Sequence, residues 1–262
     1  MLTHTYFLQK IFYQMDIKNV EPDIYVYNIA PDLLAIHPNI SPATTHKLQR
    51  SLQPPFQYRK SVYVISHLLV DDLSHYGYIC SGYQEEFSIN SKGYSYQKGN
   101  HLVQSIRNLH NVIGKEISFS DALYQSHLII EMIYDLVILN HINSFQTIDV
   151  LVEAIKYTVK NKMEEFVETI QWLYELDKQD INEVMNGALF FITKESMEKI
   201  MNMEGRINLY QNKFGLQSDE KLFYDGLKDL FQRAINLIDD DDLLFTESAR
   251  VIKNHNKLLF LK

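Results

Sequence analysis

Two segments of the chain repeat histidine and carboxylate side chains at every fourth position. The first segment carries His67, Asp71 and His75, and the second carries His127, Glu131 and Asp135. Because four residues advance an α-helix by slightly more than one turn, each set would lie along one face of a helix. Imidazole and carboxylate groups are ligands that zinc binds in proteins, so both sets have the composition and spacing of a metal site.

The number of such pairs expected by chance weakens the metal-site interpretation of these two sets, whereas their apolar surroundings strengthen it. With 10 His and 33 acidic residues among 262, about 1.3 pairs of a histidine followed four residues later by a carboxylate are expected by accident, and two occur. Both sets nevertheless lie among Val, Ile, Leu and Tyr, in segments of buried character where a carboxylate is costly unless it is paired or binds metal. Two explanations stay open: metal ligands, or solvated helix flanks and His–Asp pairs that satisfy each other.

A third region, "NIAPDLLAIHPNISPATTH", adds candidates ahead of these helices. Asp32 follows Pro31 directly, and His37 and His46 come a short distance later. Aspartate at such a boundary is commonly a helix cap, so Asp32 is either a cap or a ligand. His4, near the start of the first predicted helix, would by itself be an ordinary surface residue.

The scarcity of helix-breaking residues predicts that helices position these side chains. The chain has only 9 Gly and 6 Pro, and no proline follows Pro55. With 46% hydrophobic residues in a chain of 262, we expect an all-α protein with a substantial core. The central helices are predicted at residues 61–80 and 118–142, the two longest strongly apolar segments.

The other segments alternate between shorter helices and turns. Further helices are predicted at residues 3–15, 23–30, 181–202, 219–238 and 241–258, and amphipathic helices also follow residue 147. Pro31 is expected to end the second helix or to open the next turn. Residues 37–55 and 81–100 are expected to be loops, because the first is rich in turn residues and the second lacks periodicity.

Composition narrows the classes of function. The single Cys80 excludes an internal disulfide framework, and the first residues lack the pattern of a signal peptide, so we expect an intracellular, cytoplasmic protein. No apolar run approaches the roughly 18 to 20 residues that span a bilayer. The net charge of −8 argues against a general affinity for nucleic-acid backbones.

The order of the motifs resembles the zinc-dependent phospholipase C family of bacteria, whose metal sites are similar to those of the single-strand-specific zinc nucleases. The resemblance rests on an early histidine, His4, then "APD", a downstream histidine, "SHLLVDDLSHYG" and "SHLIIEMIYD". It covers about residues 1–142 and implies an all-α, multi-helical metal-binding core of the phospholipase C type. Residues 143–262 would add C-terminal helices, either as a region of their own or packed into the same domain.

Position by position, the resemblance implies ligands for two zinc ions and part of a third site. The first ion would be surrounded by Asp32, His46, His67 and Asp71. The second ion would be held by His75, His127 and Glu131. A third would use His4 and Asp71 together with a free amino terminus, and no processing signal precedes His4, so two ions are the expectation.

The segment between His67 and His75 leaves one ligand open. The gap from Asp71 to His75 is shorter than is usual in the family, so Asp72 could replace Asp71, or His75 could fall outside the ligand set. Asp71 is the expected bridging residue, because it alone shares a helical stripe with both His67 and His75.

A paired zinc site implies chemistry on phosphate esters. Two ions about 3.5 to 4 Å apart can clamp such an ester, polarise its phosphorus and supply hydroxide at neutral pH. The resemblance gives Asp32 a further role as the base that orients the attacking water. Asp135 would hold His127 or a neighbouring ligand in place, unless it lies on the helix surface. We therefore expect a phosphodiesterase or phospholipase C-like hydrolase of a small phosphoester or a lipid headgroup, with substrate and oligomeric state left open.

Two alternatives to this enzyme remain. The first is a helical regulatory or binding protein that keeps the metal-site scaffold with little catalysis and uses its C-terminal helices as a partner surface. The second is a site for another divalent metal, such as a di-iron or di-manganese bundle, although the Glu-x-x-His pairs of such bundles are missing from the two stripes. No glycine-rich phosphate loop, HExxH or paired CxxC points to a different class.

Overall fold

The computed structural model describes residues 1–81, 90–142, 145–216, 221–238 and 241–255, and every regular element in this part of the chain is helical. In chain order the α-helices are α1 (Leu2–Gln14), α2 (Asp23–Leu34), α3 (Pro42–His46), α4 (Ser61–His75), α5 (Tyr94–Gly99), α6 (Val103–Val112), α7 (Phe119–Ile142), α8 (Phe145–Asn161), α9 (Met163–Tyr174), α10 (Lys178–Phe191), α11 (Lys194–Ile200), α12 (Met203–Phe214), α13 (Lys221–Leu237) and α14 (Asp241–Asn254). Short 3₁₀ turns lie at η1 (Phe56–Tyr58) and η2 (Asn100–Leu102). The predicted all-α class is confirmed.

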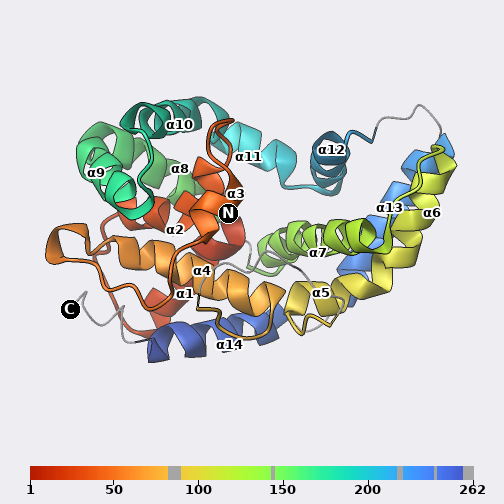
Figure 1. The fold of residues 1–262 in the computed structure, drawn as a ribbon, viewed down its shortest axis with the longest axis horizontal. Coiled ribbons are helices and arrows are strands. Elements are labelled where there is room, and N and C mark those ends of the chain that lie inside the picture. The colour runs from red at the N-terminus through yellow and green to blue at the C-terminus, as the bar shows by residue number, and fades with distance from the viewer. Residues whose placement is uncertain (82–89, 143–144, 217–220, 239–240, 256–262) are drawn as a thin grey trace.

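α4 is the inner helix of the part of the molecule that holds the N-terminus (Figure 1). It packs against α2 and also against α14, so helices cover it from the beginning and the end of the chain. Its residues 61–70 are all buried. The polar side chains of a helix that is buried all round must find their partners inside the protein. This requirement applies to His67, which lies on the buried stretch.

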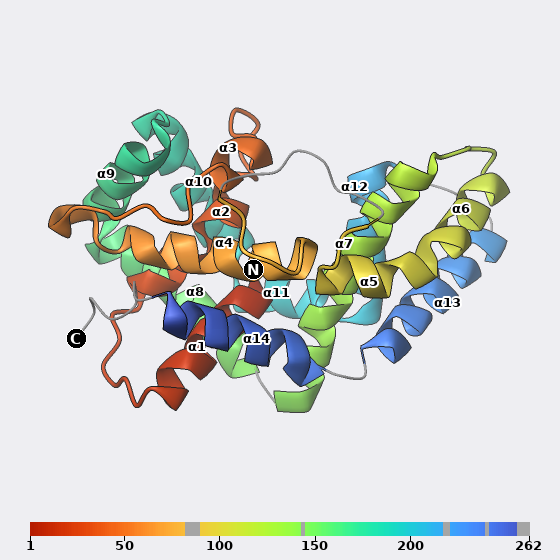
Figure 2. The ribbon, with the colours of Figure 1, turned by 60° about the horizontal axis from the view of Figure 1, so that its bottom comes forward.

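α7 is the other long buried helix, with 24 residues. Figures 1 and 2 show it running between the helices around α4 and the group formed by α5, α6 and α13, all of which contact it. Among the described helices, α7 included, none combines the length and the apolar character needed to cross a bilayer.

The helices after residue 142 pack on those before it. α8 lies against α1 and α2, α13 lies against α6 and α7, and α14 lies against α4 and α1. Buried apolar side chains from both parts of the chain form one cluster, from Leu2 in α1 to Ile252 in α14. The C-terminal helices therefore help to hold α4 and α7 at fixed positions relative to one another.

α2 is longer than predicted, because it continues through Pro31 to Leu34. A proline inside a helix removes one backbone hydrogen bond. Here ten of the twelve residues of α2 are buried, Pro31 among them, and this packing outweighs the lost bond. The expectation that Pro31 ends the helix or opens a turn was wrong, and Asp32 consequently lies within the last turns of α2 rather than at its start.

Two predicted loops also contain helices. α3 lies within residues 37–55, where Ser41 caps it by accepting a hydrogen bond of 3.1 Å from the Thr44 amide and Pro42 takes its first position. α5 lies within residues 81–100, of which residues 82–89 are outside the described chain. The predicted helix 181–202 is divided into α10 and α11 by Thr193, which caps α11. The periodicity also missed α6 and α12.

Gly93 fixes how the chain returns to the end of α4. A Cβ atom at Gly93 would lie 2.1 Å from the carbonyl carbon of His75 and 2.4 Å from the carbonyl oxygen of Ser74. Both neighbours are backbone atoms of α4, which cannot move away as a flexible side chain could. The absence of a side chain at Gly93 therefore sets the distance between α5 and the last turn of α4.

Gly93→Ala is expected to destabilise the fold. Forced overpacking typically costs about 1 to 3 kcal/mol, and a domain of this size loses roughly 2 to 4 °C of melting temperature per kcal/mol. Thermal unfolding should therefore move several degrees lower. The matched control is Gly187→Ala inside α10, where a Cβ atom meets nothing closer than 3.6 Å, and this variant should melt at the same temperature or slightly higher. Equal melting of Gly93→Ala and wild type would contradict the close approach.

Candidate metal centre

α4 carries three of the predicted ligands into the interior. His67, Asp71 and His75 lie one helical turn apart on the same side of the helix, as their spacing predicts. His67 has no exposed surface at all, and only 14% of the Asp71 side chain is exposed. Any charge on these residues must therefore be balanced within the protein.

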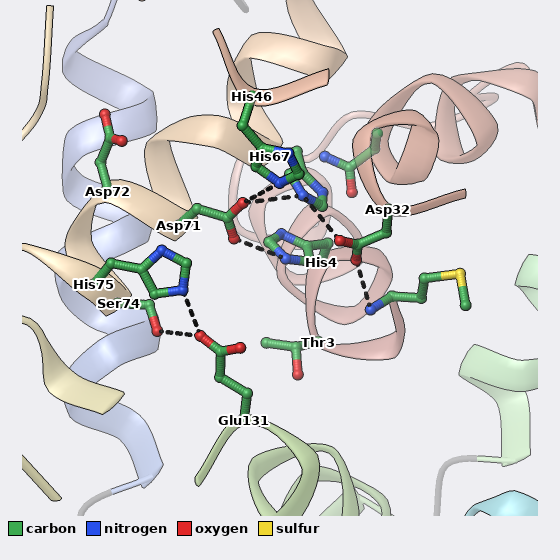
Figure 3. A network of polar contacts seen from close by, with 12 residues as sticks. Thr3, His4, Asp32, His46, His67, Asp71, Asp72, Ser74, His75 and Glu131 are labelled. Carbon is green, nitrogen blue, oxygen red and sulfur yellow. Dashed lines mark hydrogen bonds and ion pairs between the residues drawn. The ribbon is translucent and has the colours of Figure 1, made fainter. Parts of the chain in front are cut away.

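Asp71 lies at the centre of a group of three imidazole rings (Figure 3). Its Oδ2 atom is 3.1 Å from Nε2 of His67 and 3.3 Å from Nε2 of His46. Its Oδ1 atom is 3.2 Å from Nε2 of His4, whose ring stacks on that of His67 at 3.6 Å between centroids. α1, α3 and α4 thus each contribute one histidine to the same carboxylate.

Asp32 completes this first group from α2. Its Oδ1 atom is 3.8 Å from Nε2 of His67, and its Oδ2 atom is 3.2 Å from the amino group of Met1. Two sets of three donors result, each with ligand atoms within 4.8 Å of one another: His4, His67 and Asp71 in one, and Asp32, His46 and His67 in the other. The structure therefore gathers the ligands proposed for the first ion, and adds His4 beside them.

A second group forms where the end of α4 meets α7. Nε2 of His75 is 2.7 Å from Oε1 of Glu131, and His127 brings a third donor within 4.8 Å of both. The Ser74 hydroxyl donates to the same Glu131 oxygen at 3.3 Å. Residues of both groups line one cavity of about 560 Å³. Ligands that the sequence separates by more than a hundred residues therefore face a shared space.

The first group keeps its carboxylates ionised. Burial alone would raise the pKa of Asp71, but His67 and His4 outweigh it and hold that pKa well below its usual range. The pKa of Asp32 is lowered in the same way, against burial, by the Met1 amino group and His67. Burial, helped by the neighbouring His4, lowers the pKa of His67. Ionised carboxylates and a neutral imidazole are the protonation states that metal binding requires.

The ring of His46 has the orientation of a metal ligand. Its Nδ1 atom lies 2.8 Å from the Pro42 carbonyl oxygen, to which it donates its proton. In the neutral ring Nε2 then carries a lone pair, and this atom lies 3.3 Å from an oxygen of Asp71. Such an arrangement is repulsive unless a second proton or a cation lies between the two atoms. Asp71 indeed raises the pKa of His46, although burial opposes this.

Several buried nitrogen atoms of the first group lack hydrogen-bond partners among the described residues. Nδ1 and Nε2 of His67 are buried without a hydrogen-bond partner among the described residues, because the 3.1 Å approach of Nε2 to Asp71 lacks hydrogen-bond geometry. Nδ1 of His4 is in the same position. Buried polar atoms without partners are costly, and a cation beside Asp71 would give Nε2 of His67 one. Neutral imidazoles with carboxylates are a donor set that suits zinc.

The second group holds opposite charges in close contact. Burial disfavours the charged form of His75, but the Glu131 carboxylate outweighs this and raises the pKa of His75 to about 9. Burial would raise the pKa of Glu131, and His75 lowers it instead. Burial lowers the pKa of His127 to about 3, so this ring is neutral. A metal ion here would replace the proton that His75 carries in its absence.

Asp72 faces away from the first group (Figure 3). It binds Arg50 instead. Nη2 and Nε of Arg50 donate to its two carboxylate oxygens at 2.7 and 2.9 Å, and the Cys80 amide donates to it at 2.9 Å. Arg50 also donates to the carbonyl oxygen of His46 at 3.0 Å. The structure therefore gives Asp72 no place among the donor groups, and connects it to the backbone of the segment that carries His46.

Asp135, on α7, also pairs with a buried arginine. It accepts hydrogen bonds of 2.8 Å from the Thr3 amide and from Nη2 of Arg206. It is 8% exposed, so it does not lie on the helix surface. Asp135 thus contacts α1 through Thr3 and α12 through Arg206. The contact with Thr3 fixes the turn that precedes His4. Burial opposes the charge of this residue, yet Arg206 lowers the pKa of Asp135, so this carboxylate is ionised.

A further group of donors lies at the surface, between the segment after α2 and helix α10. It consists of His37, Asp180 and Glu183. Its carboxylates already accept hydrogen bonds, Asp180 from Asn39 at 3.2 Å and Glu183 from Gln179 at 2.9 Å. Both nitrogen atoms of His37 also have partners, Nε2 at 3.3 Å from Glu183 and Nδ1 at 3.4 Å from the Asn39 amide, so this set lacks the unsatisfied nitrogen atoms of the buried group.

Sequence reasoning missed Arg50 and Arg206. Neither has a spacing that links it to a ligand, because Arg50 meets Asp72 across 22 residues and Arg206 meets Asp135 across 71. The only signal was indirect: a buried carboxylate needs a cationic partner somewhere in the chain.

Comparison of the chain with protein-family models, with curated proteins and with solved structures found no match. The geometry of the site therefore carries the functional argument.

Asp71→Asn and Asp72→Asn are expected to affect different properties, zinc content and stability, although the two residues are neighbours. Asp71→Asn should lower the zinc content of the protein, measured by mass spectrometry after dialysis, because the shared carboxylate is lost. Asp72→Asn should keep its zinc but lower the free energy of unfolding of the chelator-treated protein by about 3 kcal/mol, because Arg50 is left buried and unpaired.

Urea denaturation and metal analysis of the same two variants separate these roles. A variant of Asp72 that loses zinc while the Asp71 variant retains it would contradict the assignment.

Proposed function

We propose that the protein is a metal-dependent hydrolase of phosphate esters, a phosphodiesterase or phospholipase C-like enzyme with a multinuclear zinc site. One observation carries the proposal: two separate groups of imidazoles and carboxylates line the same cavity. Divalent ions held by these groups would polarise a phosphate ester and make a nearby water more acidic. The proposed metal-binding core, residues 1–142, is of the phospholipase C type.

Asp71 is the residue that couples the ligands. Its two oxygens face different histidines, Oδ1 toward His4 and Oδ2 toward His46 and His67. A carboxylate used on both sides can bridge two ions, the role that the resemblance implies for Asp71. The helical stripe of α4 favours this residue over Asp72 for that role. The order of motifs that resembles the zinc-dependent phospholipases is therefore supported by convergence of the same residues in space.

Asp32 is placed to orient a water molecule. It lies on the cavity wall with 35% of its side chain exposed, so solvent reaches it. Its lowered pKa keeps it ionised and able to accept a hydrogen bond from water. A carboxylate this acidic is a weak proton acceptor, so its main contribution is to aim the water rather than to retain the proton.

The C-terminal helices complete the cavity. α12 contributes Arg206 and Lys213 to its wall, and α14 contributes Leu244. The buried ligands lie on helices before residue 142, and later helices supply other parts of the wall. This arrangement supports a substrate pocket over the metal groups rather than a purely structural site.

His67→Ala is expected to abolish phosphodiester hydrolysis. Protein purified without a histidine tag should contain two zinc ions per chain and hydrolyse bis(p-nitrophenyl) phosphate. His67→Ala should lose metal and reduce kcat/KM by more than about a hundredfold, because even residues that only support metal ligands cost 10- to 100-fold. His101→Ala changes an exposed histidine in η2 and is the matched control, with activity and metal content unchanged.

Chelation gives an independent test that needs no variant. Removal of zinc should stop turnover and lower the melting temperature, and added zinc should restore both. Protein without bound metal whose stability is insensitive to chelator would contradict the proposal. Two bound ions without turnover of any phosphate ester would instead favour a regulatory or binding protein on the same scaffold.

A further inference from the structure

The cavity has a wall that the metal groups do not form. α12 contributes two cationic side chains to it, Arg206 and Lys213. The two side chains differ in whether a carboxylate of the protein neutralises their charge. Arg206 is 7% exposed and its guanidinium donates to Asp135 at 2.8 Å, so its charge is neutralised within the protein. Its Nη2 atom can bind a ligand only by leaving that pair.

Lys213 has no such partner among the described residues. It lies in the last turn of α12 with an exposed side chain, and no salt bridge or hydrogen bond joins it to a carboxylate in this part of the chain. Lys213 and the ligands of the second metal group line the same cavity, so the charge of this lysine faces the space that a ligand of that group would occupy.

Tyr124 lies between a ligand of the second metal group and the residue that follows Lys213. Its ring lies 5.0 Å from the ring of His127 and 6.3 Å from the ring of Phe214, which directly follows Lys213. Tyr124 also lines the cavity. An aromatic surface thus extends from the second metal group toward the end of α12, along which the organic part of a ligand can lie.

The charges of the loaded site favour an anionic ligand. Two divalent ions would bring four positive charges against the three carboxylates Asp32, Asp71 and Glu131 of the donor groups. The excess is positive before Lys213 is counted, and Lys213 adds to it at a point away from these ligands. A singly charged phosphodiester meets the ions but leaves Lys213 unused.

Resting on the proposed function, we infer that Lys213 is a specificity-determining residue that receives a second negative charge on the substrate. The substrate class is then a phosphate ester that carries another anionic group, a carboxylate or a second phosphate, rather than one with a cationic alcohol. A structural role at the C-terminal end of α12, where a cation complements the helix dipole, predicts an effect on stability but none on ligand choice.

Two phosphonates that differ in one charge test this inference on the zinc-loaded protein. Phenylphosphonate and 4-carboxyphenylphosphonate share the group that meets the metals, and only the second has an anion on the far side of the ring. Isothermal titration calorimetry should show tighter binding of the carboxylated probe to wild type. Lys213→Met should weaken that probe about five- to tenfold and leave phenylphosphonate within about twofold.

Lys178→Met is the matched control, because it removes one exposed lysine at the start of α10, away from the residues that line the cavity. It should leave both affinities unchanged. Equal weakening of both probes by Lys213→Met, or no weakening of either, would overturn the inference.

Turnover separates the inference from the function on which it rests. The substrates are p-nitrophenyl diesters whose second alcohol carries a phosphate, no charge or a trimethylammonium group, and wild type should prefer the first. If the carboxylated probe depends on Lys213 but no diester is hydrolysed, the ligand preference holds and the hydrolase fails. If diesters are hydrolysed with a preference that Lys213→Met does not change, the inference fails alone. If neither phosphonate binds, both are overturned.

Discussion

The buried carboxylate of Asp71 imposes the constraint on which the centre of this protein depends. It is ionised, almost covered, and surrounded by imidazoles of three different helices. An ion of this kind is stable in the interior only if positive charge is supplied at the same place. Protons on the histidines can supply it, but burial keeps His67 neutral. A divalent cation would balance the charge of the carboxylate, and His67 would not need to be protonated.

Two buried arginine–aspartate pairs hold this arrangement in place. Arg50 and Asp72 connect α4 to the segment of His46, and Arg206 and Asp135 connect α7 and α12 to the turn before His4. Each pair lies beside a donor group without belonging to it. The charges that determine the positions of these helices are therefore balanced outside the donor groups.

The features that sequence could predict are those set by local spacing. Helical periodicity placed His67, Asp71 and His75 on one face and favoured Asp71 over Asp72, since the next residue along a helix points in another direction. Spacing could not relate His4, Asp32 or His46 to that face. These residues lie on other helices, and only the resemblance in the order of motifs connected them.

The incorrect predictions made from the sequence have a common physical cause. Pro31 and the turn-rich segment around α3 looked like interruptions, yet burial of α2 and capping by Ser41 make both stretches helical. Local signals lose to tertiary packing when most of a segment is buried. Arg50, Arg206 and Lys213 were missed for a related reason, because a charged residue shows its partner, or its lack of one, only after the chain is folded.

Anomalous diffraction from crystals of the zinc-loaded protein, measured on both sides of the zinc absorption edge, would locate any bound zinc. We expect one peak between Asp71 and the histidines His46 and His67, and a second between His75, His127 and Glu131. No peak at Asp71, or zinc only at the surface group of His37, Asp180 and Glu183, would contradict this expectation.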